Sequence, residues 1–195
     1  GTGEIGWAPI MGVGYYQNLT LWNNGPNSYG CSNFQSDLSV ITSGANGFTF
    51  RTDDHAGSFA GATAATFASN QFTVNGVIEQ NTDMDNIRFT LPATSRFQLA
   101  AVPYNVGTGN SGSNLDLQVS LYNNSQVLIA SYNPGTLLSS VIDSVLTAGT
   151  YYLRIEGRGN IYAPNYASLG SYALQGSYSI GGTLPLRRLE LTGEL

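Results

Sequence analysis

The chain has 195 residues, enough to bury a substantial hydrophobic core. Charged residues make up 10% of it and hydrophobic residues 42%, and glycine occurs 24 times, which excludes a disordered acidic tail and a Glu/Lys-rich helical bundle. The seven basic residues are all arginine and are outnumbered by twelve acidic residues, for a net charge of -5, so the basic stripe that binds nucleic acid is missing. No apolar run approaches the roughly 18 residues that span a bilayer, so we expect no membrane span.

Residues 1–47 are rich in glycine, asparagine and aromatic side chains. Within them, residues 35–42 read QSDLSVIT and predict a short helix with Leu38 and Ile41 on one face. We expect the remainder of this segment to be loop. The composition then changes to small residues around an acidic stretch, Asp53–Asp54–His55, which indicates a boundary near Gly47.

The pattern from residue 72 to residue 180 is typical of β-strands. Apolar and polar residues alternate over residues 115–122 and 151–156, which gives each segment one dry and one wet face. Asn, Gly and Pro turns separate these from the other strand candidates, which are residues 87–91, 97–102, 126–132, 137–142 and 171–180. Seven or eight short strands without helical periodicity predict a mainly-β fold, an antiparallel β-sandwich or jelly roll, with a small barrel as the alternative.

The chain has few residues able to perform hydrolysis. It has one histidine, His55, and no His-Glu-x-x-His sequence, whereas a catalytic zinc site normally takes three protein ligands. We therefore expect this chain to be inactive on its own. A hydrolase built on His55 is the weakest hypothesis, and it predicts that His55→Ala abolishes activity.

Acidic residues offer a different kind of site. Asp83 and Asp85 lie close to Glu79 in sequence, and Asp53 and Asp54 are candidate neighbours. Carboxylates are hard oxygen ligands, so this set suits Ca²⁺ and does not suit zinc. The other interpretation is that these residues cap turns by bonding to nearby backbone groups.

Twelve tyrosines provide a candidate binding surface. The best placed are Tyr162 and Tyr166, in a long loop that reads NIYAPNY, where their rings could stack on sugars or anchor a protein surface. The alternative is that the tyrosines are the ordinary half-buried residues of strand surfaces.

Residues 6–16 read GWAPIMGVGYY, and Trp22 and a Gln35-Ser-Asp37-Leu38 segment follow. This region resembles the Met-turn of metzincin-like secreted zinc metallopeptidases. The resemblance implies that Met11 lies beneath a zinc ion as an apolar floor and that Tyr15 or Tyr16 faces the substrate cleft. In that family the zinc ligands and the catalytic glutamate precede the Met-turn, so the resemblance assigns Zn²⁺ to the parent peptidase only.

A second resemblance covers roughly residues 50–180. Five motifs occur in order at residues 76–78, 83–89, 115–122, 148–153 and 170–174, and they are similar to those of the bacterial pre-peptidase C-terminal domain. The sequence departs from that pattern at Ile87, where an aromatic residue is more usual. The resemblance implies a β-sandwich appended to a secreted peptidase, and domains of this family can carry a calcium site.

A third, shorter resemblance concerns residues 184–190, which read LPLRRLE. They are similar to the linker that leads into the C-terminal sorting domains of proteins secreted by Bacteroidetes-type bacteria. This resemblance implies a secreted or cell-surface location.

Together these features predict a metallopeptidase remnant at residues 1–47, a β-sandwich at 48–182 and a sorting linker at 183–195. The primary hypothesis is a non-catalytic downstream fragment of a secreted zinc metallopeptidase, whose sandwich aids substrate binding, stability or secretion. Its partners would be the missing N-terminal peptidase half and a protein or polysaccharide substrate. The alternative is a calcium-stabilised carbohydrate- or protein-binding adhesion module without a peptidase parent.

Overall fold

The structure is a computed structural model, and it describes residues 4–10, 12–14, 16–105 and 112–181. The predictions for Met11, Tyr15 and the sorting linker at 183–195 therefore lie outside the described residues.

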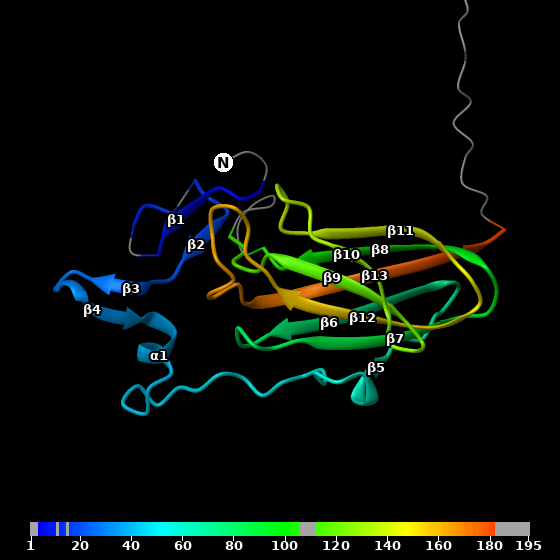
Figure 1. Cartoon of the computed structure of the whole chain (residues 1–195), viewed down its shortest axis with the longest axis horizontal. Coiled ribbons are helices and arrows are strands. Elements are labelled where there is room, and N and C mark those ends of the chain that lie inside the picture. The colour runs from blue at the N-terminus through cyan, green and yellow to red at the C-terminus, as the bar shows by residue number, and fades with distance from the viewer. Residues whose placement is uncertain (1–3, 11, 15, 106–111, 182–195) are drawn as a thin grey trace, which may run out of the picture.

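Two β-sheets form the body of the molecule (Figure 1). A five-stranded sheet has the order β10-β9-β12-β7-β5, and a four-stranded sheet has the order β11-β8-β13-β6. Their strands are β5 (Thr63–Ala64), β6 (Gln71–Ile78), β7 (Asp85–Leu91), β8 (Ser95–Pro103), β9 (Leu117–Asn123), β10 (Leu128–Tyr132), β11 (Ser140–Leu146), β12 (Gly149–Gly157) and β13 (Gly170–Ile180). All pairs are antiparallel except the short parallel contact of β5 with β7. The prediction of a mainly-β, antiparallel fold is confirmed, and in the described residues the two sheets keep separate edges, so they form no closed barrel.

The core lies between the two sheets because one face of each strand is apolar. Phe89 on β7 stacks on Phe97 of β8, with ring centroids 4.4 Å apart, and on Tyr151 of β12. Phe72 on β6 extends this aromatic cluster, and Phe67 covers its end. Burying large rings supplies much of the hydrophobic free energy of a small sandwich, so this cluster holds the two sheets together.

One strand begins later than its sequence pattern suggests. Residues 137–142 were expected to be a strand, but β11 runs from Ser140 to Leu146. The reason is that Leu138 packs in a separate small cluster with Ile5 and Leu19 of the N-terminal segment. The apolar residues that suggested a strand here therefore serve a contact between two parts of the chain.

The N-terminal segment contains the expected short helix, α1 (Asp37–Ile41), whose first turn is capped by the Ser36 side chain accepting from the Ser39 amide. It also contains four short strands that the sequence did not reveal: β1 (Trp7–Pro9), β2 (Leu19–Leu21), β3 (Asn24–Asn27) and β4 (Gly30–Ser36). β1 pairs in parallel with β2, and β3 pairs with β4 as an antiparallel hairpin. No helix in the described ranges is long and apolar enough to cross a bilayer.

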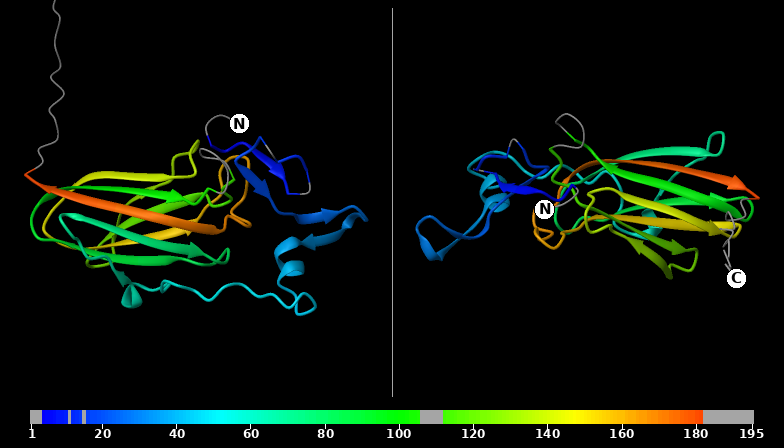
Figure 2. Two further views of the ribbon diagram at one scale, coloured as in Figure 1. Left: turned by 180° about the vertical axis from the view of Figure 1, so that it is seen from behind. Right: turned by 90° about the horizontal axis from the view of Figure 1, so that it is seen from above.

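The N-terminal segment lies at one end of the sandwich, and the stretch that follows α1 runs back beside the sheets to the 3-10 helix η1 (Phe59–Gly61) (Figures 1 and 2). Polar contacts attach the segment to the loops at that end. The Thr20 amide and hydroxyl both donate to Asn114 Oδ1, at 3.0 and 2.8 Å, and the Leu138 amide donates to Glu4 Oε2 at 2.9 Å. These contacts attach the Glu4 and Thr20 parts of the segment to the loop end of the sandwich.

Candidate functional site

Three consecutive parts of the chain bring the predicted acidic residues to one place. Asp53 and Asp54 lie on the loop that leads into the sandwich, Glu79 follows the last residue of β6, and Asp85 is the first residue of β7. Asp83 lies in the turn between β6 and β7, where its amide donates to the Gln80 carbonyl at 3.0 Å. The turn brings the end of β6 to the start of β7, and the entry loop folds back over both.

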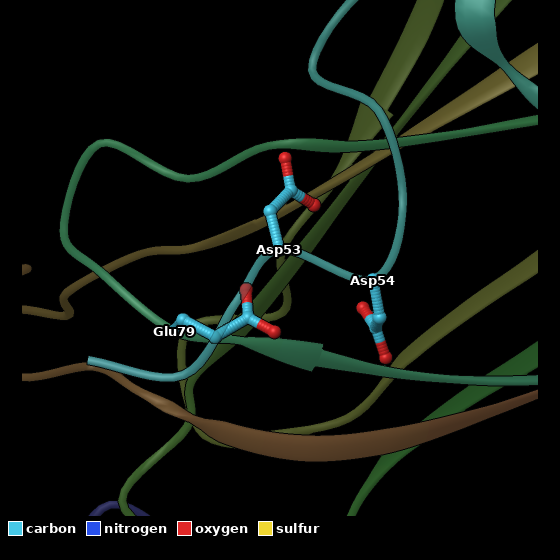
Figure 3. A group of neighbouring side chains, drawn as sticks. All are labelled: Asp53, Asp54 and Glu79. Carbon is cyan, nitrogen blue, oxygen red and sulfur yellow. The ribbon is translucent and has the colours of Figure 1, made fainter. Parts of the chain in front are cut away.

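The structure gathers all five carboxylates that the sequence suggested. Ligand atoms of Asp53, Asp54 and Glu79 lie within 4.8 Å of one another, and so do those of Asp53, Asp83 and Asp85. Figure 3 shows the first of these groups, with Asp53 and Asp54 at adjacent positions of the loop and Glu79 where β6 ends. Asp53 belongs to both groups and links them into one acidic cluster.

Glu79 is the buried member on the β6 side. The residue is 6% exposed, and both carboxylate oxygens are buried without a hydrogen-bond partner among the described residues. Burial is the main reason that the pKa of Glu79 rises to about 8, and the neighbouring Asp83 and Asp54 raise it further. The ionised form of Glu79 thus lacks both solvent and a positive partner.

Asp85 is fully buried, and it is held by the last strand of the sandwich. The Tyr172 hydroxyl on β13 donates to Asp85 Oδ2 at 2.6 Å, whereas Asp85 Oδ1 is buried without a partner. Burial raises the pKa of Asp85 to about 8 even though the Tyr172 hydrogen bond lowers it. Gly76 on β6 leaves space for the Tyr172 ring, since a Cβ at that position would overlap it.

The entry loop also covers the free edge of β6. Asp54 Oδ1 accepts from the Val77 amide at 3.3 Å, and His55 Nε2 donates to the Asn75 carbonyl at 2.9 Å. The other ring nitrogen of His55 contacts Thr63 Oγ1 at 2.8 Å. Both nitrogens of His55 therefore make contacts within the fold, which attach the entry loop to β5 and β6.

The cluster can exist in two chemically reasonable ways. Carboxylates this close repel one another when ionised, so either protonation of the buried members or a shared cation would stabilise the cluster. All the donor atoms are oxygens, and the imidazole beside them points elsewhere, so the donor set matches a hard cation such as Ca²⁺ and not Zn²⁺.

The predicted aromatic binding residues lie on a different part of the molecule. Tyr162 is 50% exposed in the loop after β12. The hydroxyl of Tyr166 contacts Ser36 Oγ at 2.9 Å and accepts from the Leu38 amide at 2.9 Å. Tyr166 thus attaches α1 to the sandwich, and a ligand-binding role for either ring stays a prediction. Tyr16 is 89% exposed.

One buried carboxylate was missed by the sequence reasoning. The alternation over residues 115–122 assigned Asp116 to the wet face, but Asp116 is 2% exposed because the loop after β12 and the N-terminal segment cover it. Its Oδ2 accepts from Asn160 Nδ2 at 3.0 Å, and its Oδ1 is buried without a partner. Burial raises the pKa of Asp116 to about 6. The covering segments are remote in sequence, so no local pattern could have revealed this.

No protein-family model matches the chain, and no curated protein matches it in sequence. Among solved structures, the chain is similar to the pre-peptidase C-terminal domain of a collagenase from Bacillus anthracis, with 15% identity and a TM-score of 0.38 over 60% of this chain and 94% of that one. It is also similar to PliG, a periplasmic inhibitor of g-type lysozyme from Aeromonas hydrophila, with 14% identity and a TM-score of 0.38 over 60% of this chain and 96% of that one. A third is the Yersinia pseudotuberculosis-derived mitogen, with 17% identity and a TM-score of 0.36 over 60% of this chain and 92% of that one. A pre-peptidase C-terminal domain, the domain type that the sequence motifs resemble, is thus among the structures to which this chain is similar.

Proposed function

We propose that the sandwich is a non-catalytic accessory module that binds one structural Ca²⁺ through Asp53, Asp54, Glu79, Asp83 and Asp85. The observation that carries this proposal is Glu79, whose two carboxylate oxygens are buried in the acidic cluster without a partner. Leaving a buried carboxylate ionised and unpaired costs several kcal/mol. A divalent cation removes that cost and also the repulsion among the five carboxylates.

The ion would join the entry loop to the sheet. Asp53 and Asp54 approach from the loop, while Glu79, Asp83 and Asp85 belong to the β6–β7 corner. Bound Ca²⁺ would supply positive charge shared by both parts. Asp54 would then hold its bond to the Val77 amide more firmly, and His55 its bond to the Asn75 carbonyl, so the edge of β6 would stay covered.

Calcium titration of chelator-treated protein tests this proposal. We expect one Ca²⁺ to bind per chain by calorimetry, with a rise in Tm and much weaker binding of Mg²⁺, which demands a stricter octahedral geometry. Glu79→Gln should weaken calcium binding at least tenfold. The same change should raise Tm in chelator at pH 8, because glutamine is neutral without taking up a proton in this buried position.

Asp143→Asn is the matched control. This change also removes one aspartate charge. Asp143 lies on β11 and pairs with Arg96 on β8, away from the acidic cluster. Its calcium binding should equal that of the unaltered protein. If the unaltered protein binds no calcium, or if Glu79→Gln binds it equally well, the acidic residues act only as protonated groups and turn caps.

We further propose that residues 1–47 are the last part of a zinc metallopeptidase domain and that the parent protein is secreted. Among the described residues of this segment, seven large apolar side chains are exposed, including Trp7, Tyr29 and Phe34, whereas Ile5 and Leu19 are buried in a small cluster with Leu138. An excess of exposed over buried apolar side chains supports a segment that packs on further protein. The Met-turn resemblance of residues 6–16 supports the catalytic half as that protein.

Sequencing the source DNA upstream of Gly1, and translating it in frame, tests whether the parent protein is a zinc metallopeptidase. We expect it to encode a His-Glu-x-x-His-x-x-Gly-x-x-His sequence shortly before Gly1, which would provide the zinc ligands and the glutamate that activates water. A stop codon or an unrelated domain at that place would overturn the peptidase assignment. In that case the sandwich would be a binding module without a peptidase parent.

A further inference from the structure

The solvent-facing side of the four-stranded sheet carries an ordered array of side chains. Outward-facing residues of neighbouring strands lie in rows across β6, β13 and β8, because the strands pair in register. Asn75, Ala173 and Val102 form one such row, and Thr73, Gln175 and Ala100 form the next. This face is separate from the acidic cluster except at Asp54.

Two hollows lie side by side on this face, and both are lined by Gln175. The larger has a volume of about 580 Å³ and is bordered by Val77, Val102 and Tyr104. The smaller has a volume of about 470 Å³ and is bordered by Thr73 and Gln98. Both hollows are open to solvent, and together they follow β13 over about six residues, or about 20 Å, as an extended ligand would require.

The lining combines an aromatic ring with amide groups. Tyr104 is 67% exposed beside Val102, so its ring offers a flat apolar surface at one end of the larger hollow. The side-chain amides of Asn75 and Gln175 also line this hollow, and neither has a hydrogen-bond partner among the described residues. An amide offers two donors and an acceptor, which matches a ligand rich in hydroxyl groups.

The charges that line the hollows do not favour an anionic ligand. No arginine or histidine lines either hollow in the described part of the chain. Asp54 borders the larger hollow, and Asp143, which pairs with Arg96, borders the smaller. A phosphorylated or acidic polymer would find no cationic side chain in this lining, whereas a neutral polymer does not need one.

The geometry points to a neutral saccharide chain as the ligand of these two hollows. The proposal deepens the accessory-module function, on which it rests, by assigning it a binding face and a ligand class. One sugar ring stacks its apolar C–H face on Tyr104. The amides of Asn75 and Gln175 bond to hydroxyl groups of that sugar and of the next.

A polypeptide strand fits this region less well. An extended peptide joins a sheet at a free edge, where backbone groups are unpaired. β6 is the edge strand beside these hollows, and Asp54 and His55 already occupy two of its backbone groups, the Val77 amide and the Asn75 carbonyl. A peptide strand would have to displace these contacts, whereas a ligand on the sheet face would not.

Binding of neutral hexasaccharides to the calcium-saturated protein tests the proposal. The probes are β-1,4-glucan, β-1,4-N-acetylglucosamine, β-1,3-glucan and α-mannan hexamers, measured by calorimetry, with polygalacturonate and gelatin as an acidic and a protein probe. We expect at least one neutral hexamer to bind and polygalacturonate not to bind. Tyr104→Ala and Gln175→Ala should each weaken hexamer binding at least tenfold.

Tyr29→Ala is the matched control, because Tyr29 is an exposed tyrosine outside both hollows. It should leave hexamer binding unchanged. Both test residues are exposed on the sheet face, so an unchanged Tm should show that the variants fold. If no neutral hexamer binds, if Tyr104→Ala binds equally well, or if only gelatin binding depends on Tyr104, the saccharide proposal is wrong. The calcium proposal is tested by a separate titration, and none of these results would contradict it.

Discussion

The buried carboxylate of Asp116 lies where the N-terminal segment meets the sandwich. The small cavity beside it is lined by Thr20 and Asn114 from one side and by Asn160 from the other. The Asn160 amide donates to one oxygen of Asp116, and the second oxygen has no partner. Ionised Asp116 is therefore a cost to the folded protein.

Replacing Asp116 with asparagine should stabilise the protein in alkaline solution. Burial raises the pKa of Asp116 to about 6, so the protonated form favours folding and that contribution is lost as the pH rises from about 4 through 6. Asp116→Asn keeps the shape and stays uncharged. Urea unfolding should show the variant more stable by about 1–3 kcal/mol at pH 8 and nearly equal to the unaltered protein at pH 4.

Asp143→Asn should have the opposite effect on stability. The hydrogen bonds from Arg96 lower the pKa of Asp143, so its ionised form favours folding and the asparagine variant should lose stability at pH 8. A finding that Asp116→Asn is destabilising at pH 8 as well would mean that ionised Asp116 has a favourable partner in the cavity.

At the scale of elements, α1 is too short to be stable alone and depends on one residue of the loop after β12. The Tyr166 hydroxyl contacts both the Ser36 side chain and the Leu38 amide, at 2.9 Å each, which completes the N-terminal cap. None of the residues of α1 is buried, so packing adds little.

Tyr166→Phe should therefore release α1 without unfolding the sandwich. Losing one to two hydrogen bonds of about 1 kcal/mol each should raise the open population of this region about tenfold. Limited proteolysis within residues 38–50 should accelerate by a similar factor, while the Tm of the sandwich stays the same. Tyr162→Phe, in the same loop, should leave the cleavage rate unchanged, and equal rates in both variants would contradict the capping role.

The strands of the sandwich could be predicted where each segment carries its own two-faced pattern. β12, for example, alternates buried and less buried residues from Tyr151 to Ile155. β6 was not singled out, because Gly76 interrupts its apolar face. Strands near the N-terminus, such as β1 and β3, were missed because they are short and contain Pro, Gly or Asn, which are rare in strands. They form because of the strands with which they pair, and their own residues do not favour a strand.

At the scale of the whole molecule, the acidic cluster makes stability depend on pH and calcium together. The pKa values of Glu79 and Asp85 rise to about 8, mainly through burial, so without a cation both groups favour folding when protonated. In chelator, the free energy of unfolding should fall by several kcal/mol as the pH rises from 4 to 8.

Calcium should reverse this trend, because the ion binds only the ionised carboxylates. Thermal unfolding across pH 4–8, with chelator and with excess calcium, should give two curves that diverge as the pH rises. Two parallel curves would contradict calcium binding at these carboxylates.

The residues of this cluster could be named from the sequence, but their assembly could not. Asp83 and Asp85 are close to Glu79 along the chain, so their proximity follows from one turn. Asp53 reaches them only because the entry loop folds back over β6, and Asp85 is buried only because Tyr172 arrives from the far end of the chain. Both contacts join residues that are far apart in the sequence, so no local pattern predicts them.

The position of β13 determines the order in which the molecule can be assembled. β13 is the last strand of the described chain, yet it lies inside its sheet between β8 and β6. During synthesis, β6 and β8 must therefore wait with unpaired edges until residues 170–180 have left the ribosome, some 70 to 90 residues later. A chain that stops before β13 would lose the middle of its sheet, so even a short truncation there should abolish folding and favour aggregation.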